Sequence, residues 1–369
     1  METRALGTTG LQVSVLGFGG FHLVEIPSAD AARLLGTYLD SGGSYIETAA
    51  GYGDGKSESK IGAAVSHRRA EYVLATKSTE RTRAGFLSSL ESSLRNLKTD
   101  HVDLMFMHAV QTEAEADAIL GPGGAMEGAE EARKAGKLRY VAISGHGRPD
   151  GLLHAVKLHR FDALMTVFNY FDRFNFPTVE NDLLPLCRQR ATGLIAMKAF
   201  GDGYLHKSPV PAFRYALSMP VATVVAGINS DAMLKDDLSM LSRFTLMTDA
   251  EKEEIFRTAP ELGDYVCRLC GKCRTDEFDP QSVFLLEASF DRQMDDMRVD
   301  DSAHYALRER LKQWFQQHEV ARKEYAALKP KVDPGKDYSR LSKLCPYGID
   351  VDRKLKIAHE KLSADGYIA

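Results

Sequence analysis

The sequence has no long apolar run, no excess of charge of one sign, and few cysteines. Nothing in its 369 residues approaches the roughly 18 consecutive apolar residues of a transmembrane helix, so we expect no membrane span. Lysine and arginine total 47 against 51 acidic residues, and a net charge of −4 predicts no nucleic-acid partner. The start of the chain lacks a cationic stretch followed by an apolar core, so we expect no signal peptide. An odd number of cysteines, five, fits a reducing compartment, and we expect the protein in the cytoplasm.

Short apolar runs alternate with amphipathic stretches along the first two thirds of the chain. The expected strands are 14–20, 45–49, 72–77, 102–108, 140–146, 163–170, 193–200 and 223–228. Eight strand–helix units of this size predict an α/β fold, a (β/α)8 TIM barrel over residues 1–258. The alternative is an open doubly wound sheet, but the turn after the first strand, GFGGFH, lacks the G-x-G-x-x-G pattern that is common in such sheets.

Residues 259–369 differ in character and are expected to form a C-terminal extension. Before them, Thr248 and Glu251 form a capping-box pattern that begins the last helix of the barrel region. Residues 274–344 are polar and predict a mostly helical insertion. An apolar stripe within 302–328 indicates core packing rather than a binding surface, because amphipathic helices normally bury such a face.

Reactive side chains lie at or just after three consecutive predicted strands. Glu47 lies in the second strand, Lys77 ends the third and His108 ends the fourth, while Tyr52 follows Glu47 by five residues. In a (β/α)8 barrel these strand ends meet at one mouth. An ammonium lowers the pKa of a neighbouring phenol, a carboxylate holds that ammonium, and a neutral imidazole orients a carbonyl oxygen. Each residue alone is more often structural, but the set predicts an acid that protonates a carbonyl while a hydride arrives.

Several spaced motifs resemble the aldo-keto reductase superfamily over residues 1–258: GSYIETAAGYGDGKSESKIG, YVLATK, VDLMFMH, GKLRYVAISGH, FNYFDR, LIAMKAFGDG and VVAGINS. The rest of the chain resembles the branch of that superfamily with a C-terminal ferredoxin-type iron–sulfur extension. The resemblance implies an NAD(P)H-dependent oxidoreductase that interconverts a carbonyl and an alcohol. It implies that Tyr52 is the general acid, tuned by Lys77 and Glu47. His108 would position the substrate carbonyl.

The resemblance also implies a set of cofactor contacts. Ser144 would hydrogen-bond the nicotinamide carboxamide, and the loop from Gly227 to Ser230 would hold the phosphates near a helix N-terminus. The residues expected to contact the cofactor are Ser144, Asn169, Met197, Lys198, Gly227, Asn229, Ser230 and Asp237.

Three positions depart from the family's pattern. Glu47 stands where the family has aspartate, and Met197 replaces the aromatic ring that commonly stacks under the nicotinamide. In GINSDAMLKDD, where many members carry Arg or Lys for the 2′-phosphate of NADPH, Lys235 is the only basic residue. Because a phosphate normally needs a cation, NADH is slightly favoured over NADPH.

Three cysteines fall within the stretch VCRLCGKC. Cys267, Cys270 and Cys273 have C-x2-C-x2-C spacing, and Cys345 follows the insertion in LCPYGID. The resemblance implies that these four ligate one [4Fe–4S] cluster. A structural zinc site is an alternative, although zinc sites usually pair two C-x2–4-C knuckles, and the absence of any metal is another. Cys187 is expected to be a free, buried thiol.

The sequence leaves three functions open. The first is the carbonyl oxidoreductase, acting on a small-molecule aldehyde, ketone or alcohol. The second is a pseudo-enzyme that binds nucleotide as a redox sensor; Glu47 and Met197 favour it, whereas the complete set for acid catalysis does not. The third is an electron-transfer oxidoreductase whose cluster exchanges electrons with a ferredoxin-like carrier. A structural cluster is favoured, because hydride transfer to a carbonyl needs no one-electron relay.

Overall fold

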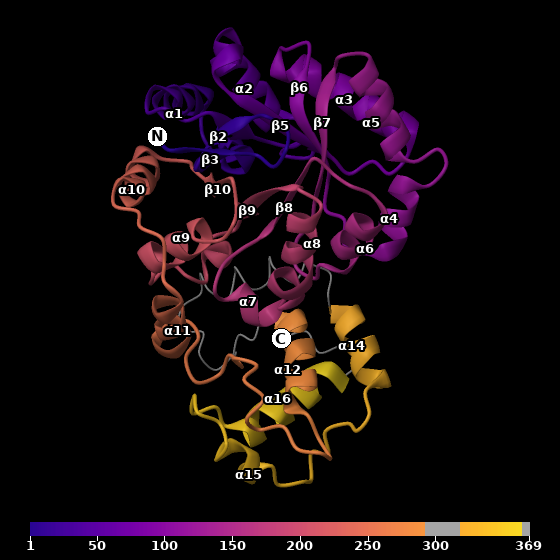
Figure 1. The fold of residues 1–369 in the computed structure, drawn as a ribbon, viewed down its shortest axis with the longest axis vertical. Coiled ribbons are helices and arrows are strands. Elements are labelled where there is room, and N and C mark those ends of the chain that lie inside the picture. The colour runs from indigo at the N-terminus through magenta and orange to yellow at the C-terminus, as the bar shows by residue number, and fades with distance from the viewer. Residues whose placement is uncertain (292–317, 364–369) are drawn as a thin grey trace. The chain divides into compact units, whose positions relative to one another are not determined.

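The computed structural model describes residues 1–291 and 318–363. The chain divides into two compact units whose segments alternate along the sequence. Figure 1 shows the helices and strands of the chain, coloured by residue number. The first unit contains Met1–Phe168, Thr178–Ala199 and Phe213–Leu246; the second contains Asn169–Pro177, Phe200–Ala212 and Met247–Ala369. The boundary after residue 258 remains a prediction. Within the described ranges, no helix combines the length and the apolar character that a bilayer crossing requires.

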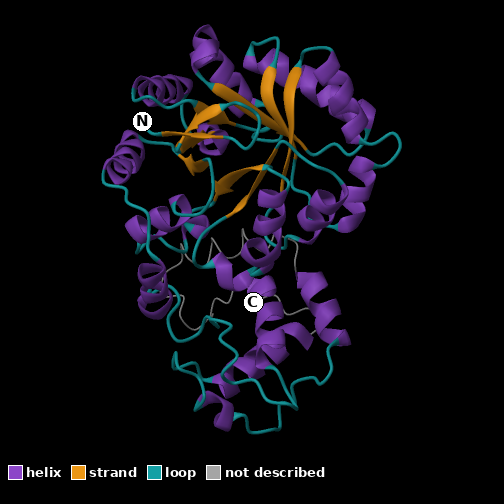
Figure 2. Cartoon of the chain, in the orientation of Figure 1, coloured by secondary structure: helices purple, strands orange, loops and turns teal. Residues whose placement is uncertain are grey.

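A closed barrel of parallel strands forms the core of the first unit (Figure 2). The ring order is β10-β3-β4-β5-β6-β7-β8-β9. These strands are β3 Leu16–Gly19, β4 Tyr45–Glu47, β5 Val73–Ser78, β6 Val102–Met107, β7 Leu138–Ser144, β8 Ala163–Val167, β9 Gly193–Met197 and β10 Thr223–Gly227. Each predicted strand is present, and the pairing of β10 with β3 closes the ring, so the open-sheet alternative is wrong. The prediction of a (β/α)8 barrel is confirmed.

Helices connect these strands and bury their apolar sides. In the first unit they are η1 Gly20–Glu25, α1 Ser28–Asp40, α2 Lys56–Val65, η2 Ser66–Glu71, α3 Arg83–Leu97, α4 Glu113–Leu120, α5 Ala125–Lys134, α6 Asp150–Leu158, η3 Val179–Leu183, α8 Leu184–Gln189 and α10 Asp231–Ser242. In α1, the buried residues follow the helical spacing; they are Ala31, Leu34, Leu35, Tyr38 and Leu39. Gly42, with a φ of 82°, turns the chain away after α1.

A short antiparallel hairpin precedes the barrel and was not among the predicted elements. β1 (Thr3–Ala5) pairs with β2 (Gln12–Ser14). Gly7 in its turn has a φ of 54°, and a Cβ there would lie 2.5 Å from the backbone nitrogen of Gly193, the first residue of β9. The hairpin therefore packs against the amino-terminal ends of the barrel strands. Strands of three residues carry too little periodicity to be predicted.

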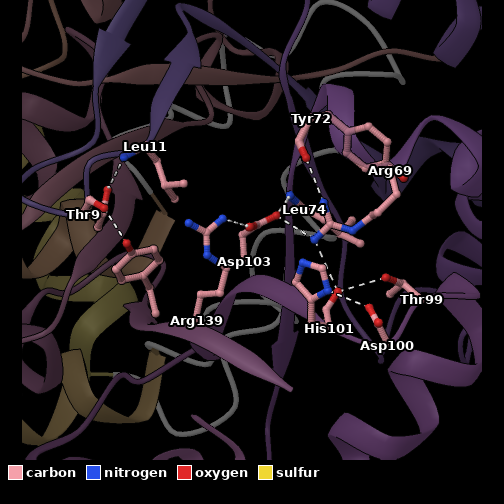
Figure 3. Close-up of polar contacts among 11 residues, drawn as sticks. Thr9, Leu11, Arg69, Tyr72, Leu74, Thr99, Asp100, His101, Asp103 and Arg139 are labelled. Carbon is pink, nitrogen blue, oxygen red and sulfur yellow. Dashed lines mark hydrogen bonds and ion pairs between the residues drawn. The ribbon is translucent and has the colours of Figure 1, made fainter. Parts of the chain in front are cut away.

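Asp103 is hydrogen-bonded to two arginines and a backbone N–H at this amino-terminal end of the barrel (Figure 3). Its carboxylate accepts hydrogen bonds from Arg69 at 2.7 Å, Arg139 at 2.6 Å and the backbone nitrogen of Leu74 at 2.9 Å. Burial would raise the pKa of Asp103, but the charge of Arg69 and these hydrogen bonds outweigh it and lower the pKa. The cluster joins the starts of β5 and β6 and stabilises the end of the barrel remote from the predicted site.

Helices α12 (Pro280–Asp291), α14 (His318–Ala327) and α16 (Val351–Ser363) form the centre of the second unit, and α12 packs against both of the others. The remaining helices are α7 Asp172–Asn175, η4 Gly201–Gly203, α11 Asp249–Thr258 and α15 Ser339–Ser342; α9, Pro209–Leu217, begins in this unit and ends in the first. The predicted capping box of Thr248 and Glu251 is present at the start of α11. Residues 302–317 of the predicted apolar stripe lie outside the described residues.

Helices α12 and α16 bury a network of opposite charges. Glu287 is fully buried and accepts hydrogen bonds from Lys354 at 2.6 Å and from Lys361 at 3.3 Å, and it contacts the Tyr265 hydroxyl. Lys361 also forms an ion pair with Asp291. Burial would raise the pKa of Glu287, but the two ammonium groups outweigh it and lower the pKa. Two lysines thus balance two carboxylates.

Candidate active site

Lys77 connects two other predicted site residues at the carboxyl-terminal ends of β4 and β5. Its ammonium donates hydrogen bonds to the Tyr52 hydroxyl at 2.9 Å and to the Thr48 carbonyl oxygen at 2.9 Å. It also forms an ion pair with the Glu47 carboxylate. Lys77 is 2% exposed and Glu47 is 4% exposed, whereas Tyr52 is only partly buried. The arrangement shields a carboxylate–ammonium pair from water and leaves the phenol within reach of a ligand.

A tight turn between β4 and α2 places Tyr52. The Tyr52 backbone nitrogen donates to the Ala49 carbonyl oxygen at 3.0 Å. Gly53 and Gly55 follow with φ values of 61° and 82°, in the left-handed region that glycine adopts without steric cost. The Phe21 ring packs edge-on against the Tyr52 ring, with centroids 5.0 Å apart. The direction of the phenol is therefore set by the turn and by a neighbouring ring.

Burial shifts Tyr52 and Lys77 in opposite directions. It raises the pKa of Tyr52 above its ordinary value and lowers the pKa of Lys77 well below its own. Contact with the Glu47 carboxylate opposes the effect on Lys77, because an adjacent anion favours the charged ammonium. The ammonium that donates to the phenol oxygen opposes the effect on Tyr52 in the same way. The sequence indicates only the effect of the ammonium, because burial of the Tyr52 ring is not visible in it. The phenol is protonated at neutral pH, and Lys77 makes its proton easier to release than burial alone would.

His108 follows β6 and lies beside Tyr52, with ring centroids 6.0 Å apart and ring planes at 79°. Burial is the largest cause that lowers the pKa of His108 well below its ordinary value, followed by the charges of Lys77, His146 and Arg81. The imidazole is therefore neutral at pH 7 and has one ring N–H to donate. This is the protonation state that the orientation of a carbonyl oxygen requires.

Ser144 and Met197 end two strands of the barrel, β7 and β9. Ser144 is fully buried, and its hydroxyl oxygen has no hydrogen-bond partner in the part of the chain that the structure describes. A buried hydroxyl of this kind calls for an explanation, and a ligand with a polar group would satisfy it. Met197 is 8% exposed, and Lys198 after it has a φ of 58°. The orphaned hydroxyl of Ser144 fits a position that hydrogen-bonds a bound amide.

The loop after β10 lies against the loop after β3. Gly227 pairs with Gly19 where the barrel closes, and a Cβ at Gly227 would lie 2.5 Å from the His22 ring. The Asn229 side-chain amide donates to the Glu25 carboxylate at 3.2 Å. The first and last strand–helix loops are therefore joined by direct contacts.

Ser230 is the N-cap of α10, and its hydroxyl accepts a hydrogen bond from the Met233 backbone nitrogen at 3.3 Å. The free N–H groups and the dipole of such a helix start favour an anion. Asp231, in the first turn, forms an ion pair with Arg33 of α1. Arg33 also donates to Asp30 at 2.9 Å, so its charge is shared between two carboxylates.

The sequence of this chain matches the profile of the aldo/keto reductase family over residues 15–216, which is more than half of its length. The chain belongs to the aldo/keto reductase family. It is an oxidoreductase that interconverts a carbonyl and an alcohol with NAD(P)H, and the sequence prediction of this enzyme class is confirmed.

Relatives of this aldo/keto reductase have oxidoreductase and dehydrogenase names. It is 29% identical over 222 residues to the oxidoreductase YqkF of Bacillus subtilis, which covers 57% of this chain and 68% of that protein. It is 27% identical over 239 residues to D-threo-aldose 1-dehydrogenase of Pseudomonas sp, which covers 55% of this chain and 71% of that protein. The structure of aldo-keto reductase AKR11C1 from Bacillus halodurans in its holo form is similar, with a TM-score of 0.59 at 25% identity over 69% of this chain and 95% of the other.

Two residues of this aldo/keto reductase that the sequence predicts as cofactor contacts, Asp237 and Asn169, are either buried or hydrogen-bonded to neighbouring residues. Asp237 is buried in α10, and burial, followed by the charge of Asp236, raises its pKa to about 7. Asn169 belongs to the second unit, where its side-chain oxygen accepts from the backbone nitrogens of Phe171 at 3.1 Å and Asp172 at 2.7 Å. Its amide nitrogen donates to the Asp172 carboxylate at 2.8 Å. The predicted roles of both residues remain predictions.

Four of the five cysteines lie in the second unit. Cys267 and Cys273 are buried in its hydrophobic core, Cys345 packs against the same core, and Cys270 is exposed. Among the described residues, no group of three or more Cys, His, Asp or Glu side chains is placed to hold a metal ion. The iron–sulfur cluster and the zinc alternative therefore remain predictions. Cys187 is a free buried thiol as expected, and burial raises its pKa to about 12.

Three contacts at the site were not anticipated from the sequence. The Thr48 carbonyl accepts from Lys77, but every residue offers a carbonyl and none is marked in a sequence. Phe21 packs on Tyr52 from the loop after β3, where an aromatic residue has no distinctive pattern. Arg81, whose charge acts on the imidazole, lies beyond the end of β5 in a polar loop that resembles ordinary solvated surface.

Proposed function

We propose that Tyr52 is the general acid of the carbonyl reduction that this chain performs. The observation that carries the proposal is the 2.9 Å hydrogen bond from the Lys77 ammonium to the Tyr52 hydroxyl, with the Glu47 carboxylate paired to the same ammonium. When Tyr52 gives its proton to a carbonyl oxygen, negative charge develops on the phenol oxygen. Lys77 stabilises that charge from a buried position, where a fixed cation acts more strongly than in water.

The remaining chemistry is divided between the cofactor and His108. Bound NAD(P)H supplies the hydride that the carbonyl carbon receives. Neutral His108 donates one hydrogen bond to the carbonyl oxygen and turns it toward Tyr52. In the direction of alcohol oxidation, the phenol oxygen accepts the proton that the alcohol releases. Glu47 acts through Lys77, by keeping the ammonium charged and in place.

We propose that Ser144, Met197, Lys198 and the loop from Gly227 to Ser230 hold the cofactor. The buried, orphaned hydroxyl of Ser144 supports a hydrogen bond to the carboxamide, and the N-terminus of α10 supports the phosphates. NADH is the favoured cofactor. Arg33 is a cation near the start of α10, but Asp30 and Asp231 already pair with it, so a 2′-phosphate would have to displace a carboxylate.

Replacing Tyr52 by phenylalanine tests the assignment of the acid, because only the hydroxyl is removed. One relative is named an aldose dehydrogenase, which supports hydroxylated aldehydes as the first substrates to assay. We expect kcat to fall about 10²–10⁴-fold in Tyr52→Phe, with NADH binding retained as quenching of its fluorescence. A Tyr52→Phe variant as fast as the wild type would assign the acid elsewhere. A wild-type protein that binds NADH but turns over no aldehyde would favour the redox sensor.

We also propose a [4Fe–4S] cluster ligated by Cys267, Cys270, Cys273 and Cys345. A charge near these cysteines supports it. Arg268 is 7% exposed and donates to the backbone carbonyls of Phe256, Leu262 and Val266, and no carboxylate of the described residues contacts it. A buried guanidinium without an anion is costly. Thiolates at Cys267 and Cys345 are close enough to stabilise its charge, and an anionic cysteine-ligated centre would supply the missing counter-charge.

Anaerobic purification followed by iron, sulfide and zinc analysis of one sample tests this cluster. We expect about four iron and four sulfide per chain. Zinc instead of iron, or no metal, would refute it. We propose a structural role, for which NADH alone leaves the visible absorbance unchanged; bleaching by NADH would favour exchange with a ferredoxin-like carrier. We also propose a cytoplasmic location, because none of the five cysteines is in a disulfide bond, and fractionation of the native cells would check it.

A further inference from the structure

Arg81 is a half-buried cation near the candidate site and has no part in the mechanism above. It lies beyond the end of β5, in the first unit, with 20% of its side chain exposed. One nitrogen of its guanidinium, Nη2, donates to the Ala109 carbonyl oxygen at 3.2 Å and to the Glu115 carboxylate at 3.1 Å. Because Ala109 directly follows His108, Arg81 binds the backbone next to the imidazole that the mechanism uses.

Ala109 has a backbone conformation that needs support. Its φ of 55° lies in the left-handed region, which a residue with a Cβ adopts only where surrounding contacts enforce it. On one side, the His108 backbone nitrogen donates to the Ser78 carbonyl oxygen at the end of β5 at 2.9 Å. On the other side, the Val110 backbone nitrogen donates to a carbonyl oxygen at the end of β7 at 2.9 Å. Arg81 adds a contact between these two, and the three together fix the turn that carries the imidazole.

Glu115 holds the guanidinium in place. The second oxygen of its carboxylate accepts hydrogen bonds from the backbone nitrogens of Gln111 at 2.8 Å and Thr112 at 3.0 Å, at the start of α4. Burial would raise the pKa of Glu115, but these hydrogen bonds and Arg81 outweigh it and lower the pKa, so the carboxylate is charged at neutral pH. Arg81 therefore pairs with an anion that is itself fixed to a helix.

The positive charge of Arg81 also acts on His108. The groups that face the imidazole are Tyr52 from the turn after β4, Lys77 from β5, His146 from the loop after β7, and Arg81. Arg81 contributes to the lowered pKa of His108 after the larger effects of burial, Lys77 and His146. Because a guanidinium stays protonated at every working pH, its charge is permanent.

We propose that Arg81 is a positioning residue for His108, because it holds the backbone that follows the imidazole and keeps a permanent positive charge beside it. The inference rests on the proposed function, in which neutral His108 turns the carbonyl oxygen toward Tyr52. The role requires no contact between Arg81 and the substrate. A displaced imidazole would donate in the wrong direction, and a misplacement of about 1 Å can cost about 10²-fold in rate.

Replacing Arg81 by glutamine tests this role, with kcat and kcat/KM measured against pH for NADH and glyceraldehyde. We expect kcat to fall about 10-fold at pH 7. We also expect the acid-side decline of kcat/KM to begin at a higher pH than in the wild type, because removing a cation raises the pKa of His108. Arg81→Lys keeps the charge without the fork of the guanidinium, so kcat should fall only about 3-fold and the acid-side decline should not move.

Arg83→Gln is the matched control. It removes the same charge two residues away, where Arg83 pairs with the exposed Glu131, and it should leave both measurements unchanged. Thermal unfolding of each variant controls for folding. If Arg81→Gln does not fold, Arg81→Lys decides, and a kcat equal to that of the wild type would then overturn the inference.

His108→Asn separates this inference from the proposed function. If His108→Asn is as active as the wild type, the proposed role of His108 fails and this inference with it. If His108→Asn loses activity while Arg81→Gln behaves as the wild type, only the inference is overturned. An equal loss at every pH in Arg81→Gln would overturn it too, and would leave Arg81 as a support for the loop alone.

Discussion

Replacing Glu287 by glutamine tests whether buried charges hold α12 to α16. The native network has two ammonium groups and two carboxylates, and Glu287 lies between Lys354 and Lys361. Glutamine has nearly the same size and accepts one of the hydrogen bonds, but the network then has one negative charge fewer for the same two lysines. Removing one partner of a buried pair costs about 3–5 kcal/mol. Because Glu287 is 0% exposed and the lysine side chains 1% and 2%, water cannot screen the leftover charge, and we expect a loss in this range.

Urea unfolding of single and double variants measures this loss. Adding Lys354→Met to Glu287→Gln removes the unbalanced charge, so the double variant should be more stable than Glu287→Gln alone by at least about 1 kcal/mol. The lowered pKa of Glu287 means that its contribution is present above the ordinary glutamate pKa of about 4.3 and is lost as the pH falls through the folded value. Losses that simply add in the double variant would refute the charge argument, because two independent deletions would then explain the data.

Three further predictions follow from other buried groups. Asp103→Asn should lower the free energy of unfolding by about 3 kcal/mol at pH 7. Because the pKa of Asp103 is lowered, the difference in the free energy of unfolding between variant and wild type, measured by urea titration, should shrink as the pH falls below about 4. Ser144→Ala should raise the KM for NADH about 2–10-fold without lowering the melting temperature; a lower melting temperature with an unchanged KM would mean that the hydroxyl serves the fold. Burial raises the pKa of Asp237 to about 7, so its charged form destabilises the fold as the pH rises through that value. Asp237→Asn should therefore increase the free energy of unfolding at pH 8 by about 1–3 kcal/mol and have little effect at pH 5. Equal effects of Asp237→Asn at both pH values in urea titrations would contradict the raised pKa.

The barrel was predictable because its strands are buried on both faces and therefore read as continuous apolar runs. YVLATK and VDLMFMH each stand out in this way from the polar segments around them, and both are strands. The hairpin of β1 and β2 has two strands of three residues each, and its pairing depends on packing against Gly193, far away in the sequence. Local pattern cannot report a contact of that kind.

The candidate site was predictable where residues sit at strand ends, and unpredictable where burial decides the chemistry. Lys77 and Glu47 could be placed together because β4 and β5 are neighbours in a barrel. Burial raises the pKa of Tyr52, but the residues that surround its ring come together only in the folded chain, so the sequence does not reveal this effect. Glu287 and Lys354 show the same limit, since charged residues in a helix usually lie on its solvated side and the sequence does not mark these two as buried.

The closure of the barrel leaves almost no space for side chains at one place. A Cβ at Gly19 would lie 2.8 Å from the Ala226 carbonyl oxygen, and a Cβ at Gly227 would meet the His22 ring. Substitutions at these two glycines would therefore disturb the barrel before they altered the proposed cofactor site. The adaptable element is the exposed ion pair of Arg33 and Asp231 at the start of α10. Removing Asp231 would leave the Arg33 guanidinium paired with Asp30 alone, so that more of its charge would be available to a phosphate at the proposed cofactor site.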